Sequence, residues 1–274
     1  MNPFENILSA VRQKRPLVHF ITNYVTVNDC ANMTLALGGS PIMADDLREV
    51  EQIVGHCSAL VLNSERTVES MLAAGKEANR LGRPVVFDPV GVGASHFRNE
   101  TAAMLLREVR FDVIKGNISE IAYLAEGIGT TKGVDANLDA LSTEGNLRWH
   151  TDLARKVSTQ TGAAIVISGP IDIVADSHEA WAIRNGHPMM ANITGTGCMS
   201  AGGIGCCVGA DPQALLPSCV CAMSAMGICG ELAYEKLLSV DGGSGTYRVL
   251  LMDAMSKLDG ATLTRRSKAE RLRI

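Results

Sequence analysis

The chain has 274 residues, of which 46% are hydrophobic and 20% are charged, a balance that excludes an intrinsically disordered protein. Its net charge of -4 does not provide the positive charge that nucleic-acid binding usually requires. The N-terminus has no cleavable apolar segment, and no run looks long enough to span a bilayer. We therefore expect a cytoplasmic protein that has neither a nucleic acid nor a membrane as a partner.

Strand-like and helix-like segments alternate along the first two thirds of the chain. Short runs rich in β-branched residues, apolar on both faces, predict buried parallel strands at 59–63, 84–88, 111–115 and 164–168. Apolar residues at helical spacing predict helices at 65–81, 100–108 and 147–161. This alternation predicts an α/β fold with a mostly parallel central sheet flanked by helices.

The remaining segments predict a hairpin, a helical last third and a polar end. Strands at 171–175 and 180–184 flank a turn at 176–178, and glycine and cysteine in the last third permit close helix packing. The basic run 265–273 is expected to be a solvated tail from about residue 264. Because we find no repeat, low-complexity segment or linker, we expect a single domain over 1–274.

A glycine-rich turn at 192–198 precedes a run of small apolar residues, 201–210, which is typical of a buried helix. Backbone N–H groups of such a turn, together with the helix N-terminus, favour an anion. Cys198 ends the turn, where the same field would favour a thiolate. The other seven of the eight cysteines lack the spacing of zinc sites and are expected to be buried packing residues.

Three of the predicted strands end on a polar residue that is followed by a turn. Asp88 precedes Pro89, Lys115 precedes Gly116, and Ser168 precedes Gly169. In open α/β sheets, ligands bind outside the carboxyl ends of the strands. We therefore expect these turns and the Gly195 loop to line one cleft.

Each of these polar residues also has a structural interpretation. Asp88 is either a ligand of magnesium-bound water or a turn-initiating aspartate. Asn117 and Glu120 have the spacing of a capping box, and they have equally the spacing to orient water on a hard cation. Lys115 is either a phosphate contact or a solvated charge at a strand end. His19 is expected to be a structural histidine rather than a catalyst.

Six motifs taken together resemble a known family. The chain resembles hydroxyethylthiazole kinase, a family with a ribokinase-like fold, from about residue 10 to about residue 260. Vitamin kinases related to this family usually have aspartate at the position of Cys198. The segments that carry the resemblance are 18–23, 37–44, 88–94, 115–121, 195–198 and 242–247.

The resemblance implies an activity and an assembly. It implies ATP- and magnesium-dependent phosphorylation of the hydroxyl of 4-methyl-5-(2-hydroxyethyl)thiazole, a salvage step toward thiamine. It also implies a homotrimer with active sites at the subunit interfaces.

The resemblance further implies roles for individual residues. Cys198 would be the catalytic base, or would only hold the alcohol in line. Lys115 and Ser168 would contact ATP. The family generally has arginine at the first of these positions, and Thr-Gly-Glu where Ser168-Gly169-Pro170 stands here. The thiazole pocket would use Asn23, Val25, Met43 and Gly195, and the magnesium would be organised, through water, by Asp88, Asn117 and Glu120.

Three other functions remain open on the residues alone. A kinase of the same fold acting on a pyrimidine or a sugar would share the anion site. A cysteine hydrolase with Cys198 as nucleophile would need a partner histidine, and all six histidines precede Cys198. A carrier of the thiazole or of a nucleotide would bind without producing ADP.

Overall fold

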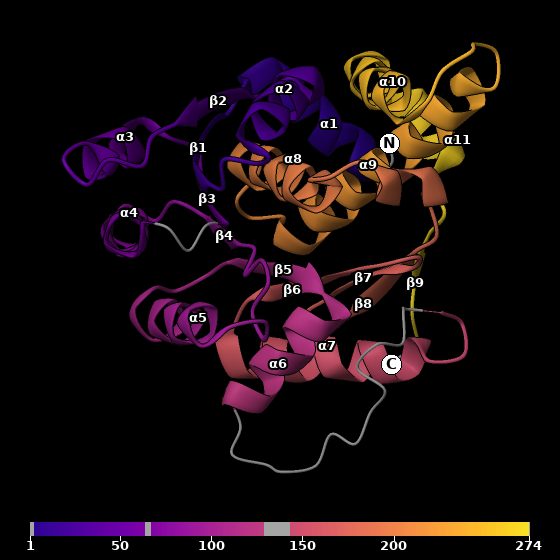
Figure 1. Cartoon of the computed structure of the whole chain (residues 1–274). Coiled ribbons are helices and arrows are strands. Elements are labelled where there is room, and N and C mark those ends of the chain that lie inside the picture. Colours follow the sequence, from indigo (N-terminus) through magenta and orange to yellow (C-terminus); the bar gives the residue numbers. More distant parts are fainter. Residues whose placement is uncertain (1–2, 64–66, 129–142, 274) are drawn as a thin grey trace.

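The computed structural model describes residues 3–63, 67–128 and 143–273, and these contain one nine-stranded mixed sheet (Figure 1). The strand order is β2-β1-β3-β4-β5-β6-β7-β8-β9. The first six strands of this order pair in parallel, and β7, β8 and β9 pair antiparallel. The strands are β1 Leu17–Thr22, β2 Ser40–Met43, β3 Ala59–Asn63, β4 Val85–Phe87, β5 Val113–Asn117, β6 Ala164–Ser168, β7 Asp172–Ala175, β8 Ala180–Ile183 and β9 Ala269–Arg271.

Helices cover both faces of this sheet (Figure 1). One layer contains α1 Pro3–Lys14, α2 Val27–Leu37, α8 Thr196–Ala210, α9 Leu215–Leu237, α10 Ser244–Lys257 and α11 Gly260–Arg266. The other contains α3 Val50–His56, α4 Val68–Arg80, α5 His96–Glu108, α6 Ile118–Ile128 and α7 Leu147–Thr161. A short 3₁₀ helix, η1 Pro188–Asn192, precedes α8. The predicted α/β architecture, its four parallel strands and its antiparallel hairpin are confirmed.

Successive residues of each strand pack alternately into two hydrophobic cores, one on each face of the sheet. This explains why the parallel strands are apolar on both faces. On β3, Val61 packs into the core beneath α8, whereas Leu62 packs into the core beneath α4. The α8 layer sits very close to the sheet at Gly205, where an added Cβ would lie 2.7 Å from Val61 Cγ2. The small residues of α8 therefore bring its N-terminus down onto the sheet.

Two expectations about the last third are wrong. The basic segment after residue 264 is not a free tail, because Ala269–Arg271 forms β9 and pairs with β8 through Ala182 and its neighbours. In addition, one helix, α9, is long and apolar enough to cross a membrane by length and composition. Most of α9 is buried inside the protein, where it packs on α8, α10 and the sheet, so its apolar residues serve the core.

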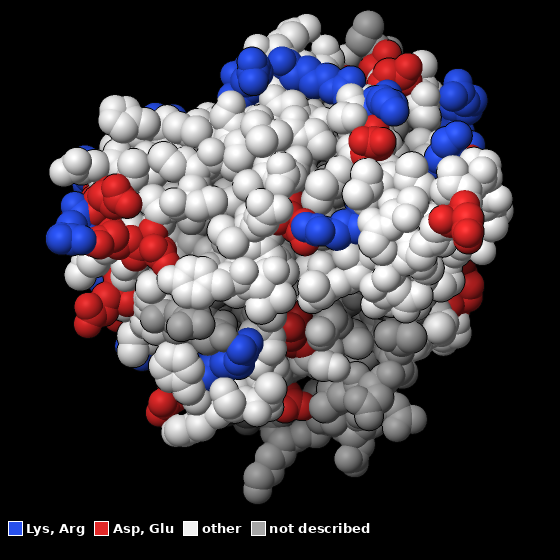
Figure 2. All heavy atoms as spheres, turned by 45° about the horizontal axis from the view of Figure 1, so that its top comes forward, with Lys and Arg blue, Asp and Glu red and all other residues white. Residues whose placement is uncertain are grey.

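Charged side chains of both signs are present on the face of the molecule shown in Figure 2. In Figure 2, basic side chains gather along the top and acidic side chains at the left, around a broad area that has few charges. Such a distribution provides no single-sign field on that face for a polyanion.

Candidate functional site

A row of polar side chains crosses the carboxyl edge of the sheet on the face that α8 covers. Each lies two residues beyond a strand residue packed in the α8 core, so the period-2 alternation of the strand directs it to the same side. For example, Val113 packs in that core and Lys115 follows it; Val86 precedes Asp88 in the same way. From β1 to β6 the row consists of Thr22, Asn63, Asp88, Lys115 and Ser168.

The N-terminus of α8 stands over this row. Gly195 caps the helix with a φ of 88°, a left-handed conformation that favours glycine, and an added Cβ would lie 2.5 Å from Thr26 Cγ2. A Cβ placed on Gly197 would lie 3.5 Å from Lys115 Nζ, so the first turn of α8 lies directly against the Lys115 ammonium. The helix end and the lysine together make the region favourable for an anion, as the glycine-rich turn predicted.

Cys198 lies on the first turn of α8 and is 7% exposed. Its Sγ accepts a 3.6 Å hydrogen bond from Asn23 Nδ2, and Asn23 Oδ1 in turn accepts bonds of 3.1 Å from the amide and hydroxyl of Thr26. Burial, with a smaller contribution from Asp88, raises the pKa of Cys198 despite the opposing effects of Thr26 and Lys115. The expectation of a thiolate is therefore wrong for the free protein, because desolvation outweighs the field of the helix end.

Lys115 and Asp88 form a buried pair, with Nζ and Oδ2 3.6 Å apart and side chains 2% and 3% exposed. Burial raises the pKa of Asp88 to about 6, while the positive charge of Lys115 acts in the opposite direction. Burial alone would lower the pKa of Lys115, but Asp88 and Glu120 raise it overall, so the ammonium stays charged. The structure excludes a solvated strand-end role for Lys115.

Asn117 and Glu120 form the capping box that their spacing predicts. Asn117 Oδ1 accepts from the Glu120 amide at 2.9 Å, and Glu120 Oε2 accepts from the Asn117 amide at 2.8 Å. Glu120 Oε1 also accepts from the Gly91 amide at 2.8 Å. Glu120 therefore ties the start of α6 to the loop that carries Asp88.

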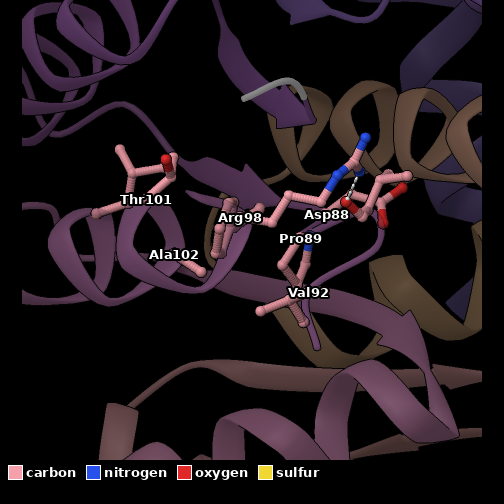
Figure 3. A pocket seen from close by; sticks show the side chains of 9 residues that line it. Asp88, Pro89, Val92, Arg98, Thr101 and Ala102 are labelled. Carbon is pink, nitrogen blue, oxygen red and sulfur yellow. Dashed lines mark hydrogen bonds between the residues drawn. The ribbon is translucent and has the colours of Figure 1, made fainter. Parts of the chain in front are cut away.

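The same loop is held from its other side by α5. Arg98 Nη1 donates to the Val90 carbonyl, and Asn99 Oδ1 accepts from the Gly93 amide at 2.7 Å. Figure 3 shows Arg98 reaching from α5 across the small pocket toward the loop that carries Asp88 and Pro89. The Asp88 loop is thus fixed by side chains from two helices.

Ser168 and an unpredicted carboxylate lie at the far end of the row. Ser168 Oγ donates a 3.3 Å bond to the Gly116 carbonyl. Asp172, at the start of β7, is buried and its Oδ1 accepts a 2.9 Å bond from the Gly169 amide. Burial raises the pKa of Asp172 to about 7, against the smaller opposing effects of this hydrogen bond and of Lys115.

The remaining predicted residues lie near β1 and β2. Met43 is half-buried at the end of β2 and packs against the core on the α8 side. Val25 is 72% exposed, so a single chain does not enclose it in a pocket. His19 is buried, with Nε2 2.7 Å from the Ala44 carbonyl, and burial lowers its pKa, as a structural histidine requires.

Two members of the row, and Asp172 beside its end on β7, are not predicted from the sequence as site residues. Thr22, Asn63 and Asp172 are buried at the carboxyl edge, yet none stands before a glycine or proline turn. Asn63 had a usable signal, because it is the polar last residue of an apolar predicted strand. Asp172 had none, because its burial depends on the packing of β7 against β6.

The donor set suits a hydrated hard cation better than a closed metal cage. Among the residues that the structure describes, no group of three or more His, Cys, Asp or Glu side chains could hold a metal ion. Asp88 nevertheless supplies a buried carboxylate beside the anion site. Magnesium is usually bound by one or two carboxylates, retained waters and substrate phosphates, and the residues present fit that mode.

Comparisons with known proteins agree with this geometry. A family model described as "Hydroxyethylthiazole kinase family" matches residues 8–261. The chain is 54% identical to the hydroxyethylthiazole kinase of Desulfovibrio desulfuricans, with 100% of both chains covered. It is also similar to the solved hydroxyethylthiazole kinase structure from Pyrococcus horikoshii, with a TM-score of 0.87, 30% identity and 100% of both chains covered.

A more distant likeness concerns the fold alone. A Bacillus subtilis pyridoxal kinase in complex with ADP aligns with a TM-score of 0.59 and 15% identity, over 78% of this chain and 90% of that one. Neighbours of this kind confirm the expected ribokinase-like fold.

Proposed function

The chain belongs to the hydroxyethylthiazole kinase family, and we propose how its own residues carry out that activity. The reaction is the phosphorylation of the hydroxyl of 4-methyl-5-(2-hydroxyethyl)thiazole by ATP, a thiamine salvage step. Family membership decides between the alternatives that the residues alone left open. The observation that carries our proposal is the convergence of Asp88, Lys115 and Cys198 under the N-terminus of α8.

The transferred phosphoryl group binds, in this proposal, at the N-terminus of α8. The amides of the Gly195 turn and the Lys115 ammonium supply the positive charge, which is most of what phosphoryl transfer requires of a protein. Ser168 contacts ATP from the end of β6. Lysine contacts a phosphate as a point charge and does not form the two-pronged contact of an arginine.

Asp88 holds the magnesium through water, and Glu120 and Asn117 organise it indirectly. When bound, magnesium neutralises charge on the phosphates of ATP. Because both Glu120 oxygens accept backbone amides, its contribution is to fix the Asp88 loop and the start of α6. The positive charge of Lys115 favours the ionised form of Asp88, and the ionised carboxylate is the form that binds a hydrated cation.

The alcohol lies between Asn23 and Cys198, with Met43 and the Gly195 backbone forming the wall of the thiazole pocket. The hydroxyl oxygen attacks the γ-phosphorus of ATP, the bond to the β–γ bridging oxygen breaks, and ADP leaves. Cys198 orients the hydroxyl and accepts its proton as a modest base. Because burial raises the pKa of Cys198, the free protein holds the thiol, which cannot accept a proton. Cys198 therefore acts as the base only after its own proton has passed to solvent, and the alcohol proton then re-forms the thiol.

We further propose that the chain acts as one kinase domain, in a cytoplasmic homotrimer. The exposure of Val25 at 72%, and of Tyr24 at 65%, on the loop that follows Asn23 supports a second subunit covering this side of the site. An interface at this position would supply the wall that a single chain leaves open.

A coupled assay tests the proposal. The purified protein with ATP, magnesium and the hydroxyethylthiazole should release ADP and form the thiazole phosphate, and a panel of pyrimidine and sugar alcohols should react poorly. ADP release with a pyrimidine or a sugar but not with the thiazole would refute the substrate assignment. A trimer measured by light scattering, which dissociates when Val25 is replaced by aspartate, would support the interface.

A further inference from the structure

Asn63, the last residue of β3, has a buried amide group that makes no hydrogen bond of normal geometry within the described residues. It is 1% exposed, and it influences the neighbouring Asp88 carboxylate weakly, without a hydrogen bond of normal length and angle. Most buried polar side chains in native proteins are hydrogen-bonded. Even the less buried Asn79 is fully hydrogen-bonded, since its Nδ2 donates to the Arg110 carbonyl at 2.8 Å and its Oδ1 accepts from the Arg110 amide at 2.7 Å.

A second unpartnered group lies beside Asn63. Thr22 is the register partner of Asn63 on β1, it is 8% exposed, and its Oγ1 also lacks a hydrogen-bond partner in the part of the chain that the structure describes. Val61 and Phe20, two residues earlier on each strand, pack in the α8 core, so both polar side chains face α8. They therefore lie side by side in the polar row.

Asp88 stands next in this row. Its amide donates to the Leu62 carbonyl at 2.9 Å, which places Asp88 alongside the end of β3. The Asn63 amide is close enough to Asp88 to act against the rise that burial causes in the Asp88 pKa. Asn63 thus has the Thr22 hydroxyl on one side, on β1, and the Asp88 carboxylate on the other, after β4, which is the polar environment that an ordered water requires.

We propose that Asn63 and Thr22 bind a water of the hydrated magnesium ion beside Asp88, so that Asn63 is a positioning residue of the phosphoryl-transfer site. The inference rests on the proposed assignment of magnesium to Asp88. A water bound to a divalent cation is a strong hydrogen-bond donor, and the Asn63 carbonyl and Thr22 hydroxyl oxygens are free to accept from it. Both side chains therefore keep hydrogen-bonding capacity that a water of the bound cation would use.

The test compares Asn63→Leu with Asn79→Leu, the same change at an amide that is already bonded and lies far from the site. Urea unfolding of the free proteins and Mn²⁺ titration of their complexes with a non-hydrolysable ATP analogue, read by electron paramagnetic resonance, need no turnover. Asn63→Leu should have an unchanged or higher urea midpoint and about tenfold weaker Mn²⁺ binding. Asn79→Leu should have a lower midpoint and unchanged Mn²⁺ binding.

Steady-state kinetics supply the second readout. Asn63→Leu should lower kcat about tenfold or more while the KM for the thiazole stays within about twofold. Thr22→Val should act in the same direction, and the double variant should be no worse than Asn63→Leu, because both side chains hold one water.

Three results would overturn the inference. A urea midpoint of Asn63→Leu as low as that of Asn79→Leu, or its failure to fold, would mean that the amide is already partnered in the free protein. If Asn63→Leu binds Mn²⁺ as tightly as the wild type, Asn63 does not hold a water of the cation. If it raises the KM for the thiazole and leaves kcat unchanged, Asn63 instead contacts the alcohol substrate. A wild-type protein that makes no thiazole phosphate would instead refute the proposed function, which leaves these two failures distinct.

Discussion

Asp172 provides the sharpest test of the electrostatics of this site. Its carboxyl is buried at the start of β7, and burial raises its pKa from 3.8 to about 7. Over that range the folded protein retains a proton at Asp172 that the unfolded chain has already released. Stability from this group is therefore complete below about pH 4 and is lost as the pH rises through about 7.

Asp172→Asn removes this titration while it keeps a carbonyl oxygen to accept from the Gly169 amide. Each pH unit in the window corresponds to about 1.4 kcal/mol. Between pH 5 and pH 8 the variant should therefore gain on the order of 3 kcal/mol relative to wild type. The contribution of Asp88, whose pKa is also raised, is present in both proteins and largely cancels in the comparison.

The assay is urea unfolding of both proteins at several pH values, at one protein concentration and with the m-value monitored. Asp253→Asn, at an exposed carboxyl on α10, is the control for the loss of one negative charge. A difference between Asp172→Asn and wild type that does not change with pH would mean that Asp172 is ionised throughout, and the reasoning from burial would be refuted. Protonation of Asp172 also has a functional consequence, because it removes one of the negative charges that surround Lys115.

The other predictions concern the helix end and the loop. Cys198→Ala should lower kcat by between tenfold and a hundredfold at saturating substrates, with Cys198→Ser less affected, and full turnover in both would remove the basic role. Glu120→Gln leaves one backbone amide facing an amide nitrogen, so it should cost about 1–3 kcal/mol in urea unfolding and raise the magnesium requirement; an unchanged magnesium titration would contradict the organising role. Gly195→Ala should cost more than the 1–2 kcal/mol of left-handed strain and raise the thiazole KM, because its Cβ also meets Thr26. Gly162→Ala, at φ 75° with no atom within 4 Å of the added Cβ, measures the strain alone, and equal costs at the two glycines would exclude the clash.

Local signals predicted much of the fold correctly. The helix predicted at 147–161 is found as α7, Leu147–Thr161, because its apolar spacing and the left-handed Gly162 beyond its end are both written in the sequence. The strands at 59–63 and 164–168 coincide with β3 and β6. The capping box of Asn117 and Glu120 is another local pattern, and its hydrogen bonds are those of the motif.

The errors arise where long-range packing decides. The segment Ala269–Arg271 reads as a charged tail, and it becomes β9 because β8 offers a free edge at the side of the sheet. The position of Cys198 at a helix end predicts a field that favours its thiolate. Its raised pKa reflects burial by elements that are distant in the sequence, including the Asn23 loop. Sequence periodicity reports which face a residue occupies and does not report how deeply that face is covered.

The site and the core are built from the same alternation. Lys115 reaches the α8 face because Val113 packs in the core on that face while Ile114 packs in the other. A one-residue shift of β5 would turn Lys115 toward α6 and place Ile114 against the first turn of α8. Such a shift would bury the Lys115 ammonium away from Asp88 and place the apolar Ile114 side chain at the anion site. The same shift therefore destabilises the core and prevents phosphate binding. The strand register that packs the two cores is therefore sufficient to align the polar row.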